Sequence, residues 1–343
     1  MKSFKFMSLM LALTACTTVF TACSKDDDDN ASGEFDYNLK AESLETPKYE
    51  KNSALYVINS EDSNIKSIEF TSSGDYIIVP SYNVYGAREN NRKPSIMRKA
   101  MKMMTRAYES GIIYGKYTVR EDGTYVLDGY GTITVNGSTD NAISLDINPN
   151  NGEPYTLEAA KKTQLPESQL TNDICRSWSF GSFRFIFTVP ALGGTLLDKE
   201  YKMNEISQLN KDMEEIAKKY ASQFDDYDDD PYKEDYEDDY AEDIELGEMP
   251  ERVIFSKAGT YMVLYTDKTL AVSTWAWENE SKGLLRYSWD YNDMYSGPSG
   301  NVQVGFRGNQ LAFTESITER DTDYEDVELE STVTFVWFMN EVK

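Results

Sequence analysis

The sequence contains no histidine, and only three of its 343 residues are cysteines. Without histidine, the chain lacks the most common general base of enzymes and the imidazole ligand of zinc, copper and non-haem iron sites. Any metal would have to be bound through oxygen, so calcium is the realistic candidate. Cys16 and Cys23 lie in the N-terminal segment. Cys175 is therefore the single thiol of the body, and a disulfide within the body is excluded.

Positive charge is also scarce, because 34 lysines and arginines face 59 acidic residues and the net charge is -25. Such a chain repels phosphate backbones, so we expect no nucleic-acid partner. The 24 tyrosines and the aromatic content of 13% nevertheless predict that most of the chain folds. The length exceeds that of one ordinary hydrophobic core and favours two domains.

Recognisable catalytic motifs are missing as well. There is no Gly-x-Ser-x-Gly elbow and no phosphate-binding loop, and Gly129-Tyr130-Gly131 lacks the third glycine of a dinucleotide fingerprint. The acidic residues are so numerous that no particular carboxylate pair stands out. We therefore expect a protein that is not an enzyme and has no catalytic residue, cofactor or dedicated metal site.

The N-terminus has the pattern of a secretory signal. Lys2 and Lys5 precede an uncharged run, residues 6–22, that ends next to Cys23. The run is too short for a comfortable bilayer span of about 20 residues. We predict that residues 1–22 are a lipoprotein signal peptide and that Cys23 becomes lipidated. Leu13-Thr14-Ala15-Cys16 offers a competing cleavage site, at which Cys16 would be lipidated instead.

Cys23 is followed by Ser24, Lys25 and four aspartates. This stretch resembles the export signal of surface lipoproteins in Bacteroidetes. The resemblance implies an outer-membrane protein exposed at the cell surface and attached to the membrane through a lipid anchor such as palmitate. The polar residues that follow predict an acidic, flexible tether over 23–47.

Short runs rich in β-branched and aromatic residues, separated by turn signals, predict a mainly β protein of antiparallel strands. In a first domain, 48–165, the expected strands are Ala54–Asn59, Ile65–Thr71, Asp75–Pro80, Ile112–Val119, Thr124–Val135 and Ala142–Ile147. In a second domain, 166–343, they are Trp178–Val189, Arg252–Ser256, Thr260–Tyr265, Thr269–Trp277, Gly283–Trp289, Val302–Phe306, Gln310–Ser316 and Ser331–Phe338.

An internal repeat links the two domains. Phe70–Tyr76 and Phe255–Tyr261 both have Phe, a hydroxyl residue, two variable residues, Gly, one variable residue and Tyr. Each predicts a hairpin whose glycine takes a positive φ at the turn. Asp122–Tyr125 has the same turn. The match indicates a duplicated domain.

The second domain resembles the lipocalin-like lipoproteins of Bacteroidetes. The strand series that carries the resemblance comprises residues 259–263, 273–277 and 285–290. Residues 174–178 lie where such domains have a short helix and a Gly-x-Trp entry, although Arg176 replaces the glycine. The resemblance implies two antiparallel lipocalin-like β-barrel or meander domains.

Helical spacing appears twice. Apolar residues recur every three or four positions on one face of a predicted helix, 204–223, which we expect to cover a barrel end or a sheet face. A basic helical insertion is predicted at 88–107.

The acidic loop 224–245 has oxygen ligands at an EF-hand spacing, but Pro231 stands where the turn needs glycine. A solvated loop and a weak calcium site both remain open.

Aromatic residues alternate along the strands of the second domain. Trp275 and Trp277 share one strand face, and Tyr287 and Trp289 share another. They are either core or the lining of a ligand cavity. We predict that these four residues bind ligand and that the protein is a non-catalytic binding module for a small apolar or glycan ligand. The alternative is an interaction or structural component of a surface protein complex.

Overall fold

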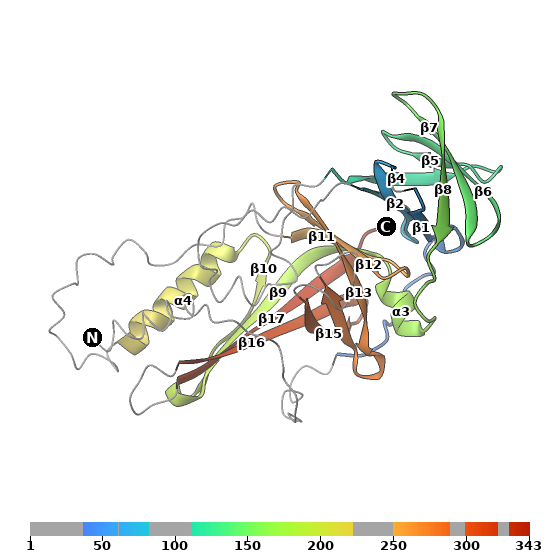
Figure 1. Cartoon of the computed structure of the whole chain (residues 1–343). Coiled ribbons are helices and arrows are strands. Elements are labelled where there is room, and N and C mark those ends of the chain that lie inside the picture. Colours follow the sequence, from blue (N-terminus) through green and yellow to red (C-terminus); the bar gives the residue numbers. More distant parts are fainter. Residues whose placement is uncertain (1–36, 61, 82–110, 222–249, 289–298, 322–328) are drawn as a thin grey trace.

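The computed structural model describes residues 37–60, 62–81, 111–221, 250–288, 299–321 and 329–343. Within these ranges the chain forms two closed antiparallel barrels of eight strands, one after the other along the sequence (Figure 1). The predicted mainly β fold with two antiparallel barrels is confirmed, and the architecture is consistent with a lipocalin-like fold.

The first barrel follows sequence order, because each strand pairs with the next and the eighth pairs with the first. Alternate side chains point inward. Among them, Ile68, Ile133 and Leu145 are completely buried in the barrel core. A 3-10 helix, η1 (Glu50–Asn52), precedes the strands β1 (Ala54–Ile58), β2 (Ile65–Phe70), β3 (Asp75–Pro80), β4 (Ile113–Val119), β5 (Tyr125–Leu127), β6 (Gly131–Thr139), β7 (Ala142–Pro149) and β8 (Tyr155–Lys161).

The second barrel is closed by the pairing of its first strand, β9, with its last, β17. The other edge of β9 pairs with β11 and, farther along, with β10, so β10 extends the sheet beside the closed barrel. The strands are β9 (Ser177–Val189), β10 (Gly194–Lys202), β11 (Pro250–Phe255), β12 (Thr260–Tyr265), β13 (Leu270–Asn279), β14 (Leu284–Ser288), β15 (Ser299–Arg307), β16 (Gln310–Asp321) and β17 (Leu329–Glu341), with 3-10 helices η2 (Pro190–Leu192) and η5 (Glu280–Lys282) between them.

Three strands differ from the sequence-based expectation. The single strand predicted over Thr124–Val135 is wrong, because β5 and β6 occupy it and a turn at Gly129, with φ 76°, separates them. The sequence pattern also misses β8 and β10. Strand β8 has one β-branched residue, and β10 has four charged residues, so neither has a typical strand composition. Pairing with β7 and β9 places them in the sheets.

The hairpins of the internal repeat have the same geometry. Gly74 and Gly259 each have φ 79°, and each donates its N–H to the backbone carbonyl of the residue three positions earlier, Thr71 or Ser256, at 3.1 Å. Gly123, with φ 85°, occupies the same place between β4 and β5. The predicted positive φ at all three turns is confirmed.

Helix α4 (Ile206–Ala221) confirms the predicted amphipathic helix. Ile206, Leu209 and Ile216 belong to the core of the second barrel, and Asp212 accepts hydrogen bonds from Lys199 and Tyr201 of β10. The short helix α3 (Gln169–Ile174) leads into β9, and Ser168 caps its N-terminus. None of the helices in the described ranges is both long and apolar enough to cross a membrane.

The described chain begins with a segment that lies on the second barrel. Phe306 donates its N–H to the carbonyl of Asn38 at 2.7 Å, and the ring of Tyr37 packs edge-on against Phe338. Ala41 is buried and donates its N–H to the carboxylate of Asp173. Residues 37–41, which fall inside the predicted tether, are therefore docked on the barrel.

The two barrels pack against each other through their outer faces, at a contact that we call the seam. Ile77 and Val79 of β3, Ile254 of β11 and Met262 of β12 form an apolar cluster across it. Ser72 of the β2–β3 hairpin donates its hydroxyl to the carbonyl of Cys175 at 2.7 Å. The strands that flank the two repeated hairpins thus meet at the seam.

Several predictions lie outside the described residues. They concern the signal peptide 1–22, lipidated Cys23, the basic helix 88–107, the acidic loop 224–245 and Trp289. Each stays a prediction.

Candidate functional site

The structure places three of the predicted ligand-binding residues in the core of the second barrel. Trp275 is 1% exposed, Tyr287 is 3% exposed, and Trp277 is partly buried against the same core. The indole N–H of Trp275 is bound by the carbonyl of Ser256 at 3.2 Å, and that of Trp277 is bound by the hydroxyl of Thr171 in α3 at 2.9 Å. Trp275 is thus hydrogen-bonded to the β11–β12 hairpin, and Trp277 to α3.

Aromatic rings lie close together inside the second barrel. The rings of Phe335 and Trp337 stack with centroids 5.3 Å apart, and Phe183 lies 5.5 Å from Trp337. Trp275 and Trp277 meet edge to face at 5.5 Å. Centroid separations of this size are typical of packed cores. A ligand that entered here would have to displace these contacts, so the interior of the second barrel favours packing over binding.

The first barrel has a row of polar side chains across its outer face. Thr134, Asp146 and Thr156 are register partners on β6, β7 and β8. They point outward because their neighbours Ile133 and Leu145 fill the barrel. We call them, with Thr124 just before β5, the polar row; the hydroxyl of Thr124 lies 3.5 Å from that of Thr134.

Hydrogen bonds fix the centre of the polar row. One carboxylate oxygen of Asp146 accepts from the amide of Asn136 at 2.7 Å, and the other accepts from the hydroxyl of Thr156 at 2.8 Å. The carboxylate is consequently held in one orientation, with lone pairs still available to a ligand.

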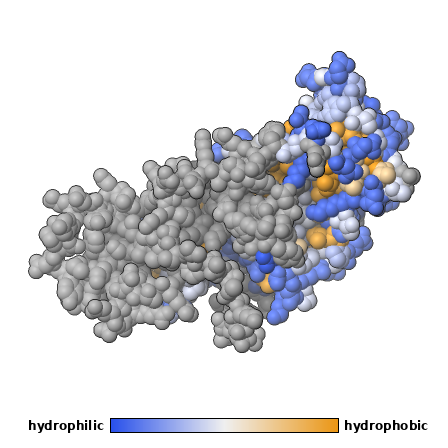
Figure 2. Space-filling model, in the orientation of Figure 1, coloured by the Kyte–Doolittle hydropathy of each residue, from blue (hydrophilic) through white to orange (hydrophobic). Residues whose placement is uncertain are grey.

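The polar row forms the floor of an open groove with a volume of about 450 Å³. Figure 2 shows mostly hydrophilic residues over the end of the first barrel that points away from the second. The groove is lined by Arg120, Thr124, Thr132, Thr134, Asp146, Ile147, Asn148, Pro154, Tyr155 and Thr156.

One partly exposed aromatic residue, Tyr155, stands at the edge of the groove. Its side chain is 37% exposed, and its hydroxyl is hydrogen-bonded to that of Tyr130 at 2.9 Å. Burial, and then the contact with Tyr155, raise the pKa of Tyr130, so the Tyr130 hydroxyl stays protonated at neutral pH. The pair holds the ring of Tyr155 in place beside the polar row.

The chemistry of the groove favours a hydroxyl-rich ligand. An apolar ligand would cover threonine, asparagine and aspartate groups without replacing their hydrogen bonds to water, at a cost of about 1–3 kcal/mol per unsatisfied group. A sugar can donate to Asp146 and exchange hydrogen bonds with the threonines, while an aromatic face packs against its ring. Within the described ranges, no three acidic or cysteine side chains lie close enough together to hold a metal ion.

Sequence reasoning misses the groove residues. Thr132 and Thr134 on β6, and Asp146 and Asn148 on β7, alternate with apolar residues as on any half-exposed strand. The missing information is the register, which places Thr134 opposite Asp146 and Asp146 opposite Thr156.

No protein-family model, curated protein or solved structure matches the chain. The candidate site therefore rests on the geometry of the chain itself.

Proposed function

We propose that the protein is a lipoprotein of the outer membrane, anchored through Cys23 and exposed at the cell surface, whose body is a non-catalytic binding module for a glycan. The observation that carries the choice of ligand is the groove on the first barrel, with its fixed carboxylate and its partly exposed tyrosine. Of the two ligand classes that the sequence leaves open, the apolar one fits this polar surface less well.

The experiment that tests ligand binding is a glycan array followed by titration calorimetry, with the soluble chain Ser24–Lys343. Tyr155→Ala and Asp146→Ala should each weaken binding at least about 10-fold, since each removes a contact worth about 1.4 kcal/mol or more. The matched control is Glu158→Gln, on the exposed outer face of β8 beyond the groove lining.

Binding that is unchanged in both groove variants would contradict the site. A different outcome is that no glycan binds and the chain pulls down a partner protein from the cell surface. The protein would then be a component of a surface protein complex and not a glycan-binding module.

Anchoring is tested separately. Cys23→Ser should release the protein from membranes, because acyl chains supply about 0.8 kcal/mol per buried CH₂ and so acidic a body has little other attraction to a bilayer. Release on Cys16→Ser instead would move the anchor to the competing site. Replacement of the four aspartates 26–29 by alanine should keep lipidation and lower the exposure of the protein to protease added outside the cell.

A further inference from the structure

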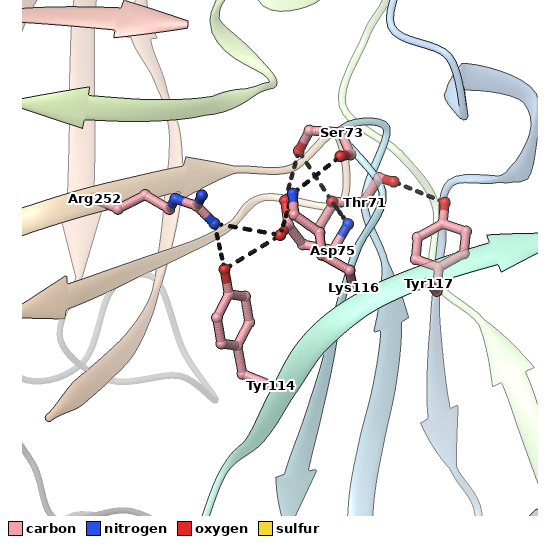
Figure 3. Close-up of polar contacts among 7 residues, drawn as sticks. All are labelled: Thr71, Ser73, Asp75, Tyr114, Lys116, Tyr117 and Arg252. Atoms are coloured by element: carbon pink, nitrogen blue, oxygen red, sulfur yellow. Dashed lines mark hydrogen bonds and ion pairs between the residues drawn. The ribbon is translucent and has the colours of Figure 1, made fainter. Parts of the chain in front are cut away.

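The seam contains two buried carboxylates with very different surroundings. Asp75 of β3 is completely buried, yet Lys116 lies 2.7 Å from it and Arg252, from the second barrel, lies 3.6 Å from it (Figure 3). Tyr114 donates its hydroxyl to Asp75 at 3.2 Å and accepts a hydrogen bond from Arg252 at 2.6 Å. The charge of Asp75 is therefore compensated from both barrels.

Glu69 of β2 is compensated much less completely than Asp75. It is 2% exposed, and its Oε2 atom has no hydrogen-bond partner among the described residues. Its register partners are Leu55 on β1 and Ile77 on β3, so its side chain stands between two buried apolar residues on the outer face of the first barrel. An ionised carboxylate is costly in such surroundings unless it is paired.

The groups that face Glu69 offset its burial only in part. The hydroxyls of Ser256 and Thr260, from the second barrel, and the charge of Lys162, after β8, all favour the ionised form. The nearby Lys257 is engaged in an ion pair with Glu50 of η1, and the thiol of Cys175 is neutral because burial raises its pKa. Burial dominates and raises the pKa of Glu69 to about 7.

We propose that Glu69 is a pH-sensitive lock between the two barrels, which holds the seam closed when its carboxyl group is uncharged and loosens it when the group is ionised. The uncharged group fits the apolar surroundings of Leu55 and Ile77. The ionised group gains from water, which reaches it only when the seam opens.

Cys175 offers a built-in reporter of this opening. Its thiol is 1% exposed, packs with the core of the second barrel and lies within reach of the charge of Glu69. Its backbone carbonyl is bound by Ser72 across the seam, and it is the only cysteine of the chain Ser24–Lys343. The experiment measures the rate at which a small maleimide labels this thiol from pH 5 to pH 8.5, in the wild type and in Glu69→Gln. The ratio of the two rates at each pH cancels the titration of the thiol itself.

The ratio of wild-type to Glu69→Gln rates should rise by roughly 10-fold per pH unit from about pH 5 and level off above about pH 7, for a total change of roughly 10²-fold. The matched control Glu158→Gln, a substitution of the same type on the exposed face of β8, should behave as the wild type. A second variant, Lys162→Met, removes an exposed positive charge that favours the ionised form of Glu69, so the pKa of Glu69 should rise further. The ratio of Lys162→Met to Glu69→Gln rates should therefore level off at a higher pH than the wild-type ratio.

Equal rates in the wild type and Glu69→Gln at every pH would overturn the lock. So would a Glu158→Gln variant that responds as Glu69→Gln does. If Glu69→Gln fails to fold, an unchanged profile in Lys162→Met overturns the proposal by itself.

Discussion

The two barrels contain the same hairpin and use it to build different interiors. Tyr117 in the first barrel and Trp275 in the second occupy equivalent places, since each donates its backbone N–H to the carbonyl of the hairpin glycine, Gly74 or Gly259. Around Trp275 the second barrel holds closely packed tryptophan and phenylalanine rings, and the apolar face of α4 belongs to the same core. The first barrel has a core without tryptophan and has the polar groove on its outside. The same hairpin thus frames a tightly packed aromatic interior in one barrel and a barrel with a polar groove in the other, and only the proposed function assigns recognition to the groove.

The largest effect is expected in the core of the second barrel. Trp275→Ala should lower the free energy of unfolding by about 3–5 kcal/mol, because a buried tryptophan leaves a cavity that its neighbours cannot fill. Trp277→Ala should cost less, since Trp277 is only partly buried. Chemical denaturation of both variants measures the difference. A Trp275→Ala protein as stable as the wild type would show that this barrel interior is not packed as described.

The next largest effect is expected at the seam, where Glu69 sets the direction in which the free energy of unfolding changes with pH. The folded chain holds a proton on Glu69 up to about pH 7, whereas the ordinary pKa is 4.5. The contribution of Glu69 to the free energy of unfolding should therefore be highest below pH 4.5, fall by about 3 kcal/mol between pH 4.5 and 7, and stay constant above pH 7. Urea denaturation at a series of pH values should show this fall in the wild type minus Glu69→Gln difference. A flat difference would remove Glu69 as its source.

The three glycines of the repeated turn should rank in a definite order. An added Cβ at Gly259 would lie 2.9 Å from the backbone oxygen of Trp275, whereas at Gly74 it would meet the movable ring of Tyr49 and at Gly123 it would meet nothing within 4 Å. All three have a positive φ, so alanine should cost about 1–3 kcal/mol, most at Gly259 and least at Gly123. Thermal melts of the three variants test the order. Equal losses of stability in the three variants would indicate that the positive φ alone, and not contact with the added Cβ, sets the cost of the substitution.

The smallest effect on stability is expected in the groove. Asp146→Ala should change the free energy of unfolding by no more than about 0.5 kcal/mol, because the side chain lies on the exposed face of β7. Denaturation curves that overlay the wild type, together with weakened glycan binding, would separate recognition from support. A loss of several kcal/mol would mean that the polar row is structural.

The sequence predicts local features of this molecule better than long-range ones. The period of Ile206, Leu209 and Ile216 and the glycine of each repeated hairpin are local signals, and the structure confirms both. Strand β10 has charged residues that mask its place beside β9. The groove and the lock depend on register and on the packing of one barrel against the other, which no single segment encodes.

The most direct test of the division between recognition and support is a hydrogen-exchange footprint of the chain Ser24–Lys343 with the glycan identified on the array. If the first barrel recognises the ligand, peptides from Arg120 to Thr156 should exchange more slowly in the complex, and peptides that contain Trp275, Trp277 and Tyr287 should be unchanged. Protection confined to the peptides of the second barrel would contradict this division and return the binding site to the aromatic interior.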